Sequence, residues 1–234
     1  MKTTFDLTVI VPFYNEEKYL HESVSRLTEQ KFIKEIILVN DASTDKSLEI
    51  ARTMVKKDKR LNLINLNKNS GKGSAVKEAL KKVVTSHVIV HDADLEYNPM
   101  DIFDMFNMLI KNSDSLILGS RTLRKRKSQN KYLITYLGNK YLTKLFSFLN
   151  NYKLSDIASC YWLIETDKLK KMNINEKGFG IEVEVLSKYI RNGGKVIEVP
   201  ISYRGRTYAD GKKIKIKDGL NILFKIIKFS KILN

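Results

Sequence analysis

The sequence predicts an α/β fold in which a mostly parallel central sheet is flanked by helices. In the first half of the chain, short apolar runs alternate with amphipathic stretches of helical spacing, which is typical of βαβ units. The run at 36–39 is continuously apolar, as expected for a strand that helices cover on both faces. With 234 residues, 43% of them apolar, the chain can bury the core of one medium-sized domain.

The strands of the first half are apolar runs that end in polar or turn-forming residues. The first ends at Pro12, and the second ends at the Asn-Asp pair after its apolar run. In chain order, strands are predicted at residues 7–11, 35–40, 61–65, 87–91 and 115–119.

Helices are predicted between these strands. The first has Leu20, Val24 and Leu27 on one face and charges on the other, and the Ser-Thr-Asp run at 43–45 can cap the second. Pro99 can open the fourth, because its fixed φ suits a first helical turn. The four ranges are residues 17–30, 43 to about 57, 73 to about 84, and 99 to about 112.

The second half is less regular. Residues 132–149 have helical spacing and many aromatic and leucine side chains, residues 196–203 read as a late strand, and residues 220–232 as an amphipathic helix. No internal repeat or proline-rich hinge divides the chain. We therefore expect a single domain spanning residues 1–234 with a specialised C-terminal half.

The charge of the chain predicts an anionic partner. Lys and Arg number 42 against 26 Asp and Glu, a formal net charge of +16. Residues 115–155 hold basic residues and no acidic one, and in 212–234 only Asp218 opposes the lysines. A Lys- and Asn-rich proteome could produce part of this excess without a function, so composition alone leaves both explanations open.

Two features predict a cytoplasmic location. No stretch approaches the ~18 uncharged apolar residues needed to cross a bilayer, and residues 1–6 lack the apolar core of a signal peptide. The single cysteine, Cys160, cannot form an intrachain disulfide, which fits a reducing compartment.

Acidic loops follow the first, second and fourth predicted strands. They contain Glu16, Asp41 and the pair Asp92 and Asp94, and the carboxyl ends of parallel strands meet at one sheet edge. Asp92 and Asp94, with Glu96 as a third oxygen donor, could hold Mg²⁺ or Mn²⁺ and so clamp a diphosphate. The alternative is that this Asp-Ala-Asp merely caps a helix, which is common for an isolated Asp-x-Asp.

The Gly-Lys-Gly at 71–73 is not a nucleoside-triphosphate phosphate loop. That loop needs a glycine five residues before its Gly-Lys pair and Ser or Thr after it, and Leu66 and Gly73 stand at those places. No Gly-x-Gly-x-x-Gly is present either, so a dinucleotide site is not expected. We still expect Lys72 to point toward a nucleotide, because its segment opens a helix at the same sheet edge.

Five blocks in order resemble glycosyltransferase family 2, whose members have the GT-A nucleotide-sugar-binding fold. The blocks are Val-Pro-Phe-Tyr-Asn-Glu-Glu at 11–17, Asn-Asp-Ala-Ser-Thr-Asp at 40–45, Gly-Lys-Gly at 71–73, Asp-Ala-Asp-Leu-Glu at 92–96 and Gly-Ser-Arg at 119–121. Within this family the likeness is greatest to the dolichyl- or polyprenyl-phosphate mannose and glucose synthases, and residues 198–203 and 206–214 also resemble that branch.

The resemblance implies roles for particular positions. It places Pro12, Tyr14, Glu16 and Asp41 around the base and ribose, Lys72 near the base, and Asp92, Asp94 and Glu96 at the metal and diphosphate. It makes Asp94, Arg121 and Arg206 the catalytic residues, with Arg121 near the acceptor phosphate and Arg206 near the donor diphosphate. Residues 1–120 are then the nucleotide-sugar-binding half and 121–234 the acceptor- and membrane-facing half.

Two positions depart from the family pattern. Ala42 stands where a glycine is usual, so we expect that turn to avoid positive φ. Residues 156–161 differ from the Asp-x-x-Ser-Gly-Phe-Arg of the mannosyl members, which leaves GDP-mannose and UDP-glucose both open as donors.

The resemblance implies an inverting transfer of a hexose to a polyprenyl or dolichyl phosphate. Such an acceptor lies in a membrane, so we expect peripheral binding to an anionic surface on the cytoplasmic face, with a membrane-anchor subunit as a possible partner. The expected contacts are residues 124–127 and apolar side chains of 132–149 and 223–229. Two alternatives are a family 2 enzyme that extends a glycan and a nucleic-acid-binding module. No nucleic-acid motif is present, so we expect no nucleic-acid partner.

Overall fold

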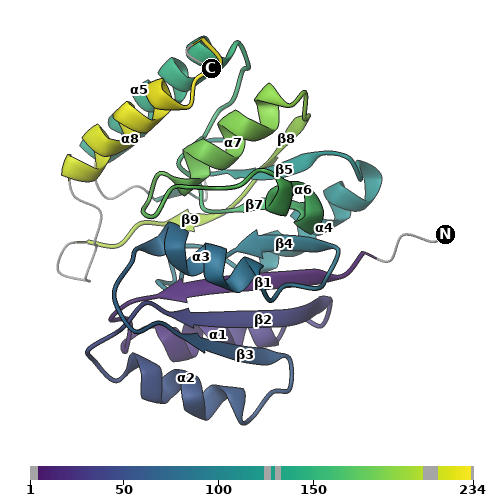
Figure 1. The fold of residues 1–234 in the computed structure, drawn as a ribbon, viewed down its shortest axis with the longest axis vertical. Coiled ribbons are helices and arrows are strands. Elements are labelled where there is room, and N and C mark those ends of the chain that lie inside the picture. Colours follow the sequence, from purple (N-terminus) through teal and green to yellow (C-terminus); the bar gives the residue numbers. More distant parts are fainter. Residues whose placement is uncertain (1–4, 124–127, 130–132, 208–215, 233–234) are drawn as a thin grey trace.

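The computed structural model describes residues 5–123, 128–129, 133–207 and 216–232, and the α/β fold with a mostly parallel sheet is confirmed (Figure 1). One seven-stranded sheet has the order β3-β2-β1-β4-β7-β5-β8. Its strands are β1 (Leu7–Phe13), β2 (Ile33–Asn40), β3 (Leu61–Asn65), β4 (His87–Val90), β5 (Leu116–Ser120), β7 (Trp162–Glu165) and β8 (Val196–Pro200).

β7 is the one strand of this sheet that runs against its neighbours, and the sequence analysis did not predict it. It pairs antiparallel with both β4 and β5, whereas β1 pairs parallel with β2 and β4, and β5 pairs parallel with β8. Trp162 and Leu163 are fully buried. The chain therefore returns from its second half into the middle of the sheet, between β4 and β5.

Helices cover both faces of the sheet and form two core layers. On one face lie α3 (Lys72–Leu80), α5 (Leu133–Asn150), α6 (Thr166–Lys171), α7 (Ile181–Arg191) and α8 (Ile216–Lys228). On the other lie α1 (Leu20–Thr28), α2 (Ser47–Val55) and α4 (Met100–Lys111). The strand side chains alternate between these layers, since Ile10 packs with the first set while Val9 and Val11 pack with the second.

A small second sheet lies near the end of β4. It pairs β6 (Ser128–Gln129) in parallel with β9 (Tyr203–Arg204), and Tyr203 forms an isolated bridge with Tyr97. The predicted strand at 196–203 is thus split in two, because the backbone N–H of Ser202 donates to Asp101 Oδ2 at 2.7 Å instead of continuing the ladder. This turn carries the chain across the loop that follows β4.

The helices α5 and α8 pack side by side at the outer side of the molecule (Figure 1). Part of the apolar set expected to face a membrane belongs instead to the core, since Leu142, Phe146 and Ile226 are buried. That part of the expectation was wrong, because helical spacing alone does not tell which apolar stripe meets the sheet. Residues 124–127, the expected headgroup contacts, lie outside the part that the structure describes, as do the side chains of 130–134.

Exposed apolar side chains remain on both helices. They recur at helical spacing as Leu137, Tyr141 and Phe148 on α5 and as Leu220, Phe224 and Ile227 on α8. Across the ranges that the structure describes, no helix is both long and apolar enough to span a bilayer.

Candidate active site

Acidic and basic side chains from distant parts of the chain meet beyond the carboxyl ends of β1 and β4. Within the described ranges the group comprises five carboxylates and two basic side chains, joined by ion pairs of 2.8–3.8 Å. Its members are Glu16, Asp92, Asp94, Glu96, Glu182, Lys72 and Arg206, and we call it the acidic cluster.

Arg206 ties the loop after β1 to the loop after β4. Its guanidinium lies 3.1 Å from Glu16 Oε2 and 3.1 Å from Asp94 Oδ2. The Nε–H of Arg206 is buried and has no hydrogen-bond partner among the described residues. The sequence analysis placed these three residues at one site, and the structure brings them together.

Lys72 forms the second link, between α3, the loop after β4 and α7. Its Nζ lies 2.8 Å from Asp92 Oδ1 and 2.8 Å from Glu182 Oε1, with the Lys72 and Glu182 side chains each 8% exposed. Burial alone would lower the pKa of Lys72, but the charges of Asp92 and Glu182 outweigh it, so this pKa lies well above its ordinary value. Lys72 is therefore a fixed cation beside Asp92, and its contact with a nucleotide stays a prediction.

The loop after β4 turns sharply so that its carboxylates face inward. Leu95 has φ +61, a left-handed conformation that is strained for a residue with a side chain, and the Glu96 N–H donates to Asp94 Oδ1 at 3.1 Å. Burial, together with the charges of Glu96 and Asp92, raises the pKa of Asp94 to about 8. The loop thus crowds negative charge into a partly buried space.

The acidic cluster fits a hard divalent cation. With all groups ionised, its five carboxylates exceed its two basic side chains by three negative charges, and all the donors are oxygen atoms. In the described part of the chain, no three His, Cys, Asp or Glu side chains converge closely enough to hold a metal by themselves. Mg²⁺ needs only one or two carboxylates when phosphate oxygens complete its shell, so Asp92 and Asp94 suffice.

Glu96, the expected third ligand, has both carboxylate oxygens engaged by protein donors. Tyr203 Oη donates to Oε2 at 2.6 Å and the Arg206 backbone N–H donates to Oε1 at 2.7 Å. These bonds hold the segment that carries Arg206 against the loop after β4. A role for Glu96 as a metal ligand stays a prediction.

The loops after β1 and β2 are fastened to each other. Asn15 Oδ1 accepts from the Thr44 N–H at 2.8 Å, and the Glu16 N–H donates to Ser47 Oγ at 2.8 Å. Asp41 is buried and accepts the N–H groups of residues 70 and 71, each at 2.8 Å. Pro12 pairs with Val39 one residue before the end of β1, and Tyr14 lies half-buried in the loop that follows. Contact of Pro12, Tyr14, Glu16 and Asp41 with a nucleotide stays a prediction.

The expectation that the turn at Ala42 avoids positive φ was wrong. Ala42 has φ +58, the left-handed conformation that glycine adopts without strain. The turn is held in place because Asn40 Oδ1 accepts the Ser43 N–H at 3.0 Å and Ser43 Oγ accepts the Asn15 N–H at 3.0 Å. Tertiary hydrogen bonds therefore impose a conformation that alanine disfavours.

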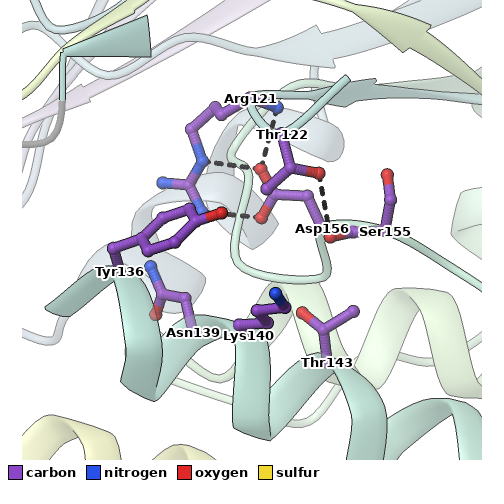
Figure 2. A pocket seen from close by; sticks show the side chains of 8 residues that line it. All are labelled: Arg121, Thr122, Tyr136, Asn139, Lys140, Thr143, Ser155 and Asp156. Atoms are coloured by element: carbon purple, nitrogen blue, oxygen red, sulfur yellow. Dashed lines mark hydrogen bonds and ion pairs between the residues drawn. The ribbon is translucent and has the colours of Figure 1, made fainter. Parts of the chain in front are cut away.

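Arg121 lies at the end of β5 in a buried ion pair rather than free in a pocket. Its Nε and Nη2 each donate to Asp156 at 2.7 Å, and its backbone N–H donates to the same carboxylate at 3.0 Å (Figure 2). Its guanidinium lies over the Tyr203 ring. Arg121 and Lys140 border a small pocket between this pair and α5 (Figure 2), with a cavity volume of about 10 Å³. That space holds about one water, so binding of an acceptor phosphate by Arg121 stays a prediction.

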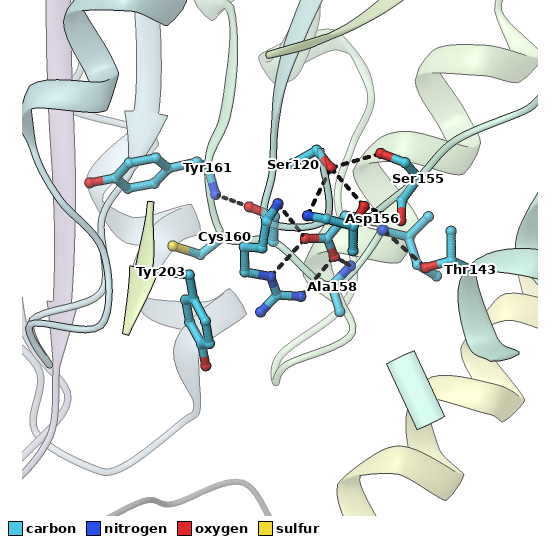
Figure 3. A network of polar contacts seen from close by, with 12 residues as sticks. Ser120, Thr143, Ser155, Asp156, Ala158, Cys160, Tyr161 and Tyr203 are labelled. Atoms are coloured by element: carbon cyan, nitrogen blue, oxygen red, sulfur yellow. Dashed lines mark hydrogen bonds and ion pairs between the residues drawn. The ribbon is translucent and has the colours of Figure 1, made fainter. Parts of the chain in front are cut away.

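Three acidic residues of this region were missed by the sequence analysis. Asp156 pairs with Arg121, Glu182 pairs with Lys72, and Glu198 accepts the backbone N–H and hydroxyl of Ser155. Figure 3 shows Ser155 and Asp156 in the loop that these bonds shape. Asp156 and Glu198 fell in segments compared with the family pattern without being assigned a role, and each of the three residues is far in sequence from its partner.

Comparison with known proteins identifies the family. The model of glycosyl transferase family 2 matches residues 8–172. Dolichol-phosphate mannosyltransferase of Pyrococcus furiosus is 29% identical over 216 residues, which cover 89% of this chain and 60% of that protein. The UDP-N-acetylglucosamine–dolichyl-phosphate N-acetylglucosaminyltransferase of Methanococcus voltae is 26% identical over 245 residues, covering 97% of each chain.

Solved structures of glucosyl-3-phosphoglycerate synthase from Mycobacterium tuberculosis share the fold. The complex with Mn²⁺, UDP and phosphoglyceric acid has a TM-score of 0.73 at 14% identity and covers 99% of this chain and 80% of that one. The complex with Mg²⁺ and UDP has a TM-score of 0.74 at 15% identity, covering 99% and 81%. On the evidence of the matched family model and the GT-A fold, this chain belongs to glycosyl transferase family 2.

Proposed function

We propose that this family 2 glycosyltransferase moves a hexose from a nucleotide sugar to a polyprenyl or dolichyl phosphate, with inversion and with Mg²⁺ or Mn²⁺ as cofactor. The observation that carries the donor part is the acidic cluster, where Arg206 and Lys72 each pair with one aspartate of the loop after β4. A site that holds excess carboxylates and fixed cations together suits a metal–diphosphate complex, which itself carries both signs of charge. The relatives that act on dolichyl phosphate support the acceptor part.

Asp92 and Asp94 would hold the divalent cation. When bound, it neutralises charge on the departing nucleoside diphosphate. Arg206 is placed to donate to diphosphate oxygens, since its Nε–H has no hydrogen-bond partner in the described ranges and its other nitrogens contact carboxylates that a cation would share. Pro12, Tyr14 and Asp41 form the neighbouring wall, where we place the base and ribose. Bound Mn²⁺ or Mg²⁺ with UDP in the solved neighbours supports this assignment.

The acceptor phosphate is already an anion, so the reaction needs cations that orient it and no strong general base. Arg121 would supply one such cation at the end of β5, with Asp156 fixing its direction. Under this proposal residues 1–120 bind the donor and residues 121–234 face the acceptor. The two halves meet in the acidic cluster, where Lys72 pairs with Glu182 and Arg206 pairs with Glu16.

We further propose peripheral binding to an anionic membrane on the cytoplasmic face, with or without an anchor subunit. The exposed apolar side chains of α5 and α8 supply the surface, and the exposed Lys140, Lys144 and Lys228 lie on the same two helices. A lipid-bound acceptor favours such a surface, since no helix in the described ranges could span a bilayer.

Labelled UDP-glucose and GDP-mannose should be offered to the purified protein with Mn²⁺ and, in parallel, a short polyprenyl phosphate or an oligosaccharide. We expect a labelled lipid phosphate with one of the two donors. Transfer to the oligosaccharide alone would refute the proposed acceptor, and no transfer from either donor to any acceptor would refute the proposed reaction. A matched reaction with EDTA measures the dependence on the cation.

A further inference from the structure

We propose that Glu182, the second residue of α7, is a positioning residue for the cation site: it holds Lys72 in place and thereby sets the charge and direction of Asp92. This inference rests on the proposed function, because it takes Asp92 as a ligand of the divalent cation. Glu182 does not contact Asp92 in a hydrogen bond, and it acts through the ammonium group of Lys72 that lies between them.

The first step of the argument is the geometry of the buried ammonium group. Lys72 Nζ reaches both oxygens of Asp92, at 2.8 and 3.0 Å, and Glu182 Oε1 at 2.8 Å. An ammonium has three N–H donors, so these three contacts satisfy it completely. Without Glu182, Lys72 would have Asp92 as its only charged partner, and it would compete fully with a metal for the same carboxylate oxygens.

The second step is the charge balance. Asp92, Lys72 and Glu182 together carry one net negative charge, whereas Asp92 and Lys72 alone carry none. A divalent cation is attracted to the first arrangement and gains little from the second, and the effect is strengthened because Lys72 and Glu182 are buried. Groups that contact a ligand of the metal typically change metal affinity by about 10–100-fold when they are removed.

The third step explains how the chain brings α7 to this place. The carbonyl oxygens of Glu176 and Lys177 approach the start of α3 so closely that a Cβ on Gly73 or Gly71 would lie 2.4 or 2.5 Å from them. The Ser74 N–H donates to the Lys177 carbonyl at 3.1 Å. The Gly-Lys-Gly sequence, which resembled a phosphate loop, thus allows the segment before α7 to dock beside Lys72.

The fourth step is an unpartnered atom. Glu182 Oε2 is buried and has no hydrogen-bond partner within the described ranges. Leaving a carboxylate oxygen desolvated is costly, so a residue selected only for packing would be better served by an apolar side chain. Burial raises the pKa of Glu182 although the charge of Lys72 acts to lower it, which reflects the same cost of burying the carboxylate. A charge kept at that cost is consistent with a role in the site.

The test is the affinity for Mn²⁺, measured by electron paramagnetic resonance with and without UDP, in wild type, Glu182→Gln, Glu182→Asp and Glu176→Gln. We expect Glu182→Gln to weaken Mn²⁺ binding about 10-fold, the lower end of that range, because Glu182 lies one contact further from the cation than Lys72, and we expect Glu182→Asp to restore much of the affinity. Glu176→Gln is the matched control, since Glu176 is a buried glutamate paired with Lys225 at 2.6 Å on the same segment and outside the cluster. It should lower thermal stability and leave Mn²⁺ affinity unchanged.

A Lys72→Met background tests whether Glu182 acts through the lysine, and it serves equally if Glu182→Gln alone does not fold. Glu182→Gln should weaken Mn²⁺ binding much less in the Lys72→Met background than in the wild type, because Glu182 acts chiefly through the lysine. If the double variant Lys72→Met/Glu182→Gln binds Mn²⁺ much more weakly than Lys72→Met does, the role of Glu182 is overturned and the proposed function stands. The same conclusion follows if Glu182→Gln keeps the wild-type affinity while Asp92→Asn loses Mn²⁺ binding. Absence of Mn²⁺ binding in the wild type would overturn both.

Discussion

Asp156 offers the clearest stability test, because one buried carboxylate holds the end of β5. Its side chain is 2% exposed and accepts two hydrogen bonds of 2.7 Å from the Arg121 guanidinium and one of 3.0 Å from the Arg121 backbone. Asp156→Asn keeps the shape of the side chain and removes its charge, which leaves the guanidinium buried without a counter-ion. Breaking such a pair costs about 3–5 kcal/mol, far above the 0–1 kcal/mol typical of surface pairs.

The assay is urea unfolding at pH 7, followed by circular dichroism, with the free energy of unfolding obtained by linear extrapolation. Asp114→Asn is the control, since that carboxylate is 99% exposed and lies 3.5 Å from Lys168, and it should leave the free energy of unfolding unchanged. Arg121→Met/Asp156→Leu should lose less than the two single changes together, because no charge stays unpaired. A loss below about 1 kcal/mol for Asp156→Asn would refute the buried ion pair.

Three further predictions concern the turn, the pH dependence and the surface. Ala42→Gly should raise the free energy of unfolding by about 0.5–1 kcal/mol, since φ +58 costs glycine nothing, and a lower urea midpoint would contradict this. Burial lowers the pKa of His87, so below pH 6.5 the unfolded chain takes up a proton that the folded chain resists. Stability should therefore fall as pH drops from about 7 to 5, less steeply in His87→Gln, and equal slopes would argue against it. Phe148→Ser and Phe224→Ser, at positions 76% and 59% exposed, should reduce sedimentation with anionic liposomes at low salt without altering the thermal midpoint. Unchanged sedimentation of both would remove these helices from the proposed membrane surface.

The residues at this sheet edge could be predicted because the sequence patterns that identify them are local. Short apolar runs give the parallel strands, and the residues just after each run form the loops that meet at the edge. Glu16, Asp92 and Asp94 were placed together on this reasoning, and the structure joins them through Arg206 and Lys72. Arg206 itself was expected there only from the resemblance to a family.

The partners of these residues could not be predicted from local patterns. Residues 181–185 alternate apolar and acidic side chains as a strand would, yet they begin α7, where Glu182 and Glu184 are both buried. Their burial depends on tertiary contacts, since Glu182 meets Lys72 from α3 and Glu184 accepts the N–H groups of residues 175 and 176. β7 was missed for a similar reason: the apolar run at 162–164 is short and leads directly into α6, and its antiparallel position is set by β4 and β5.

The apolar side chains that were expected to face a membrane show the same limit of local sequence patterns. Phe146 and Phe148 belong to one aromatic helix, but the first is fully buried and the second is 76% exposed. Only the packing of α5 against α8 and the sheet separates them. Helical spacing identifies an apolar surface, and tertiary structure decides which part of it stays outside.

The measurement that tests the central claim most directly is the rate of hexose transfer to a polyprenyl phosphate by Asp94→Ala in the presence of Mn²⁺. Asp94 is a proposed ligand of the cation and pairs with Arg206, so its loss should abolish transfer and weaken Mn²⁺-dependent nucleotide binding while the circular dichroism spectrum stays that of the wild type. Turnover by Asp94→Ala at the wild-type rate would contradict the claim that the carboxylates after β4 hold the donor diphosphate.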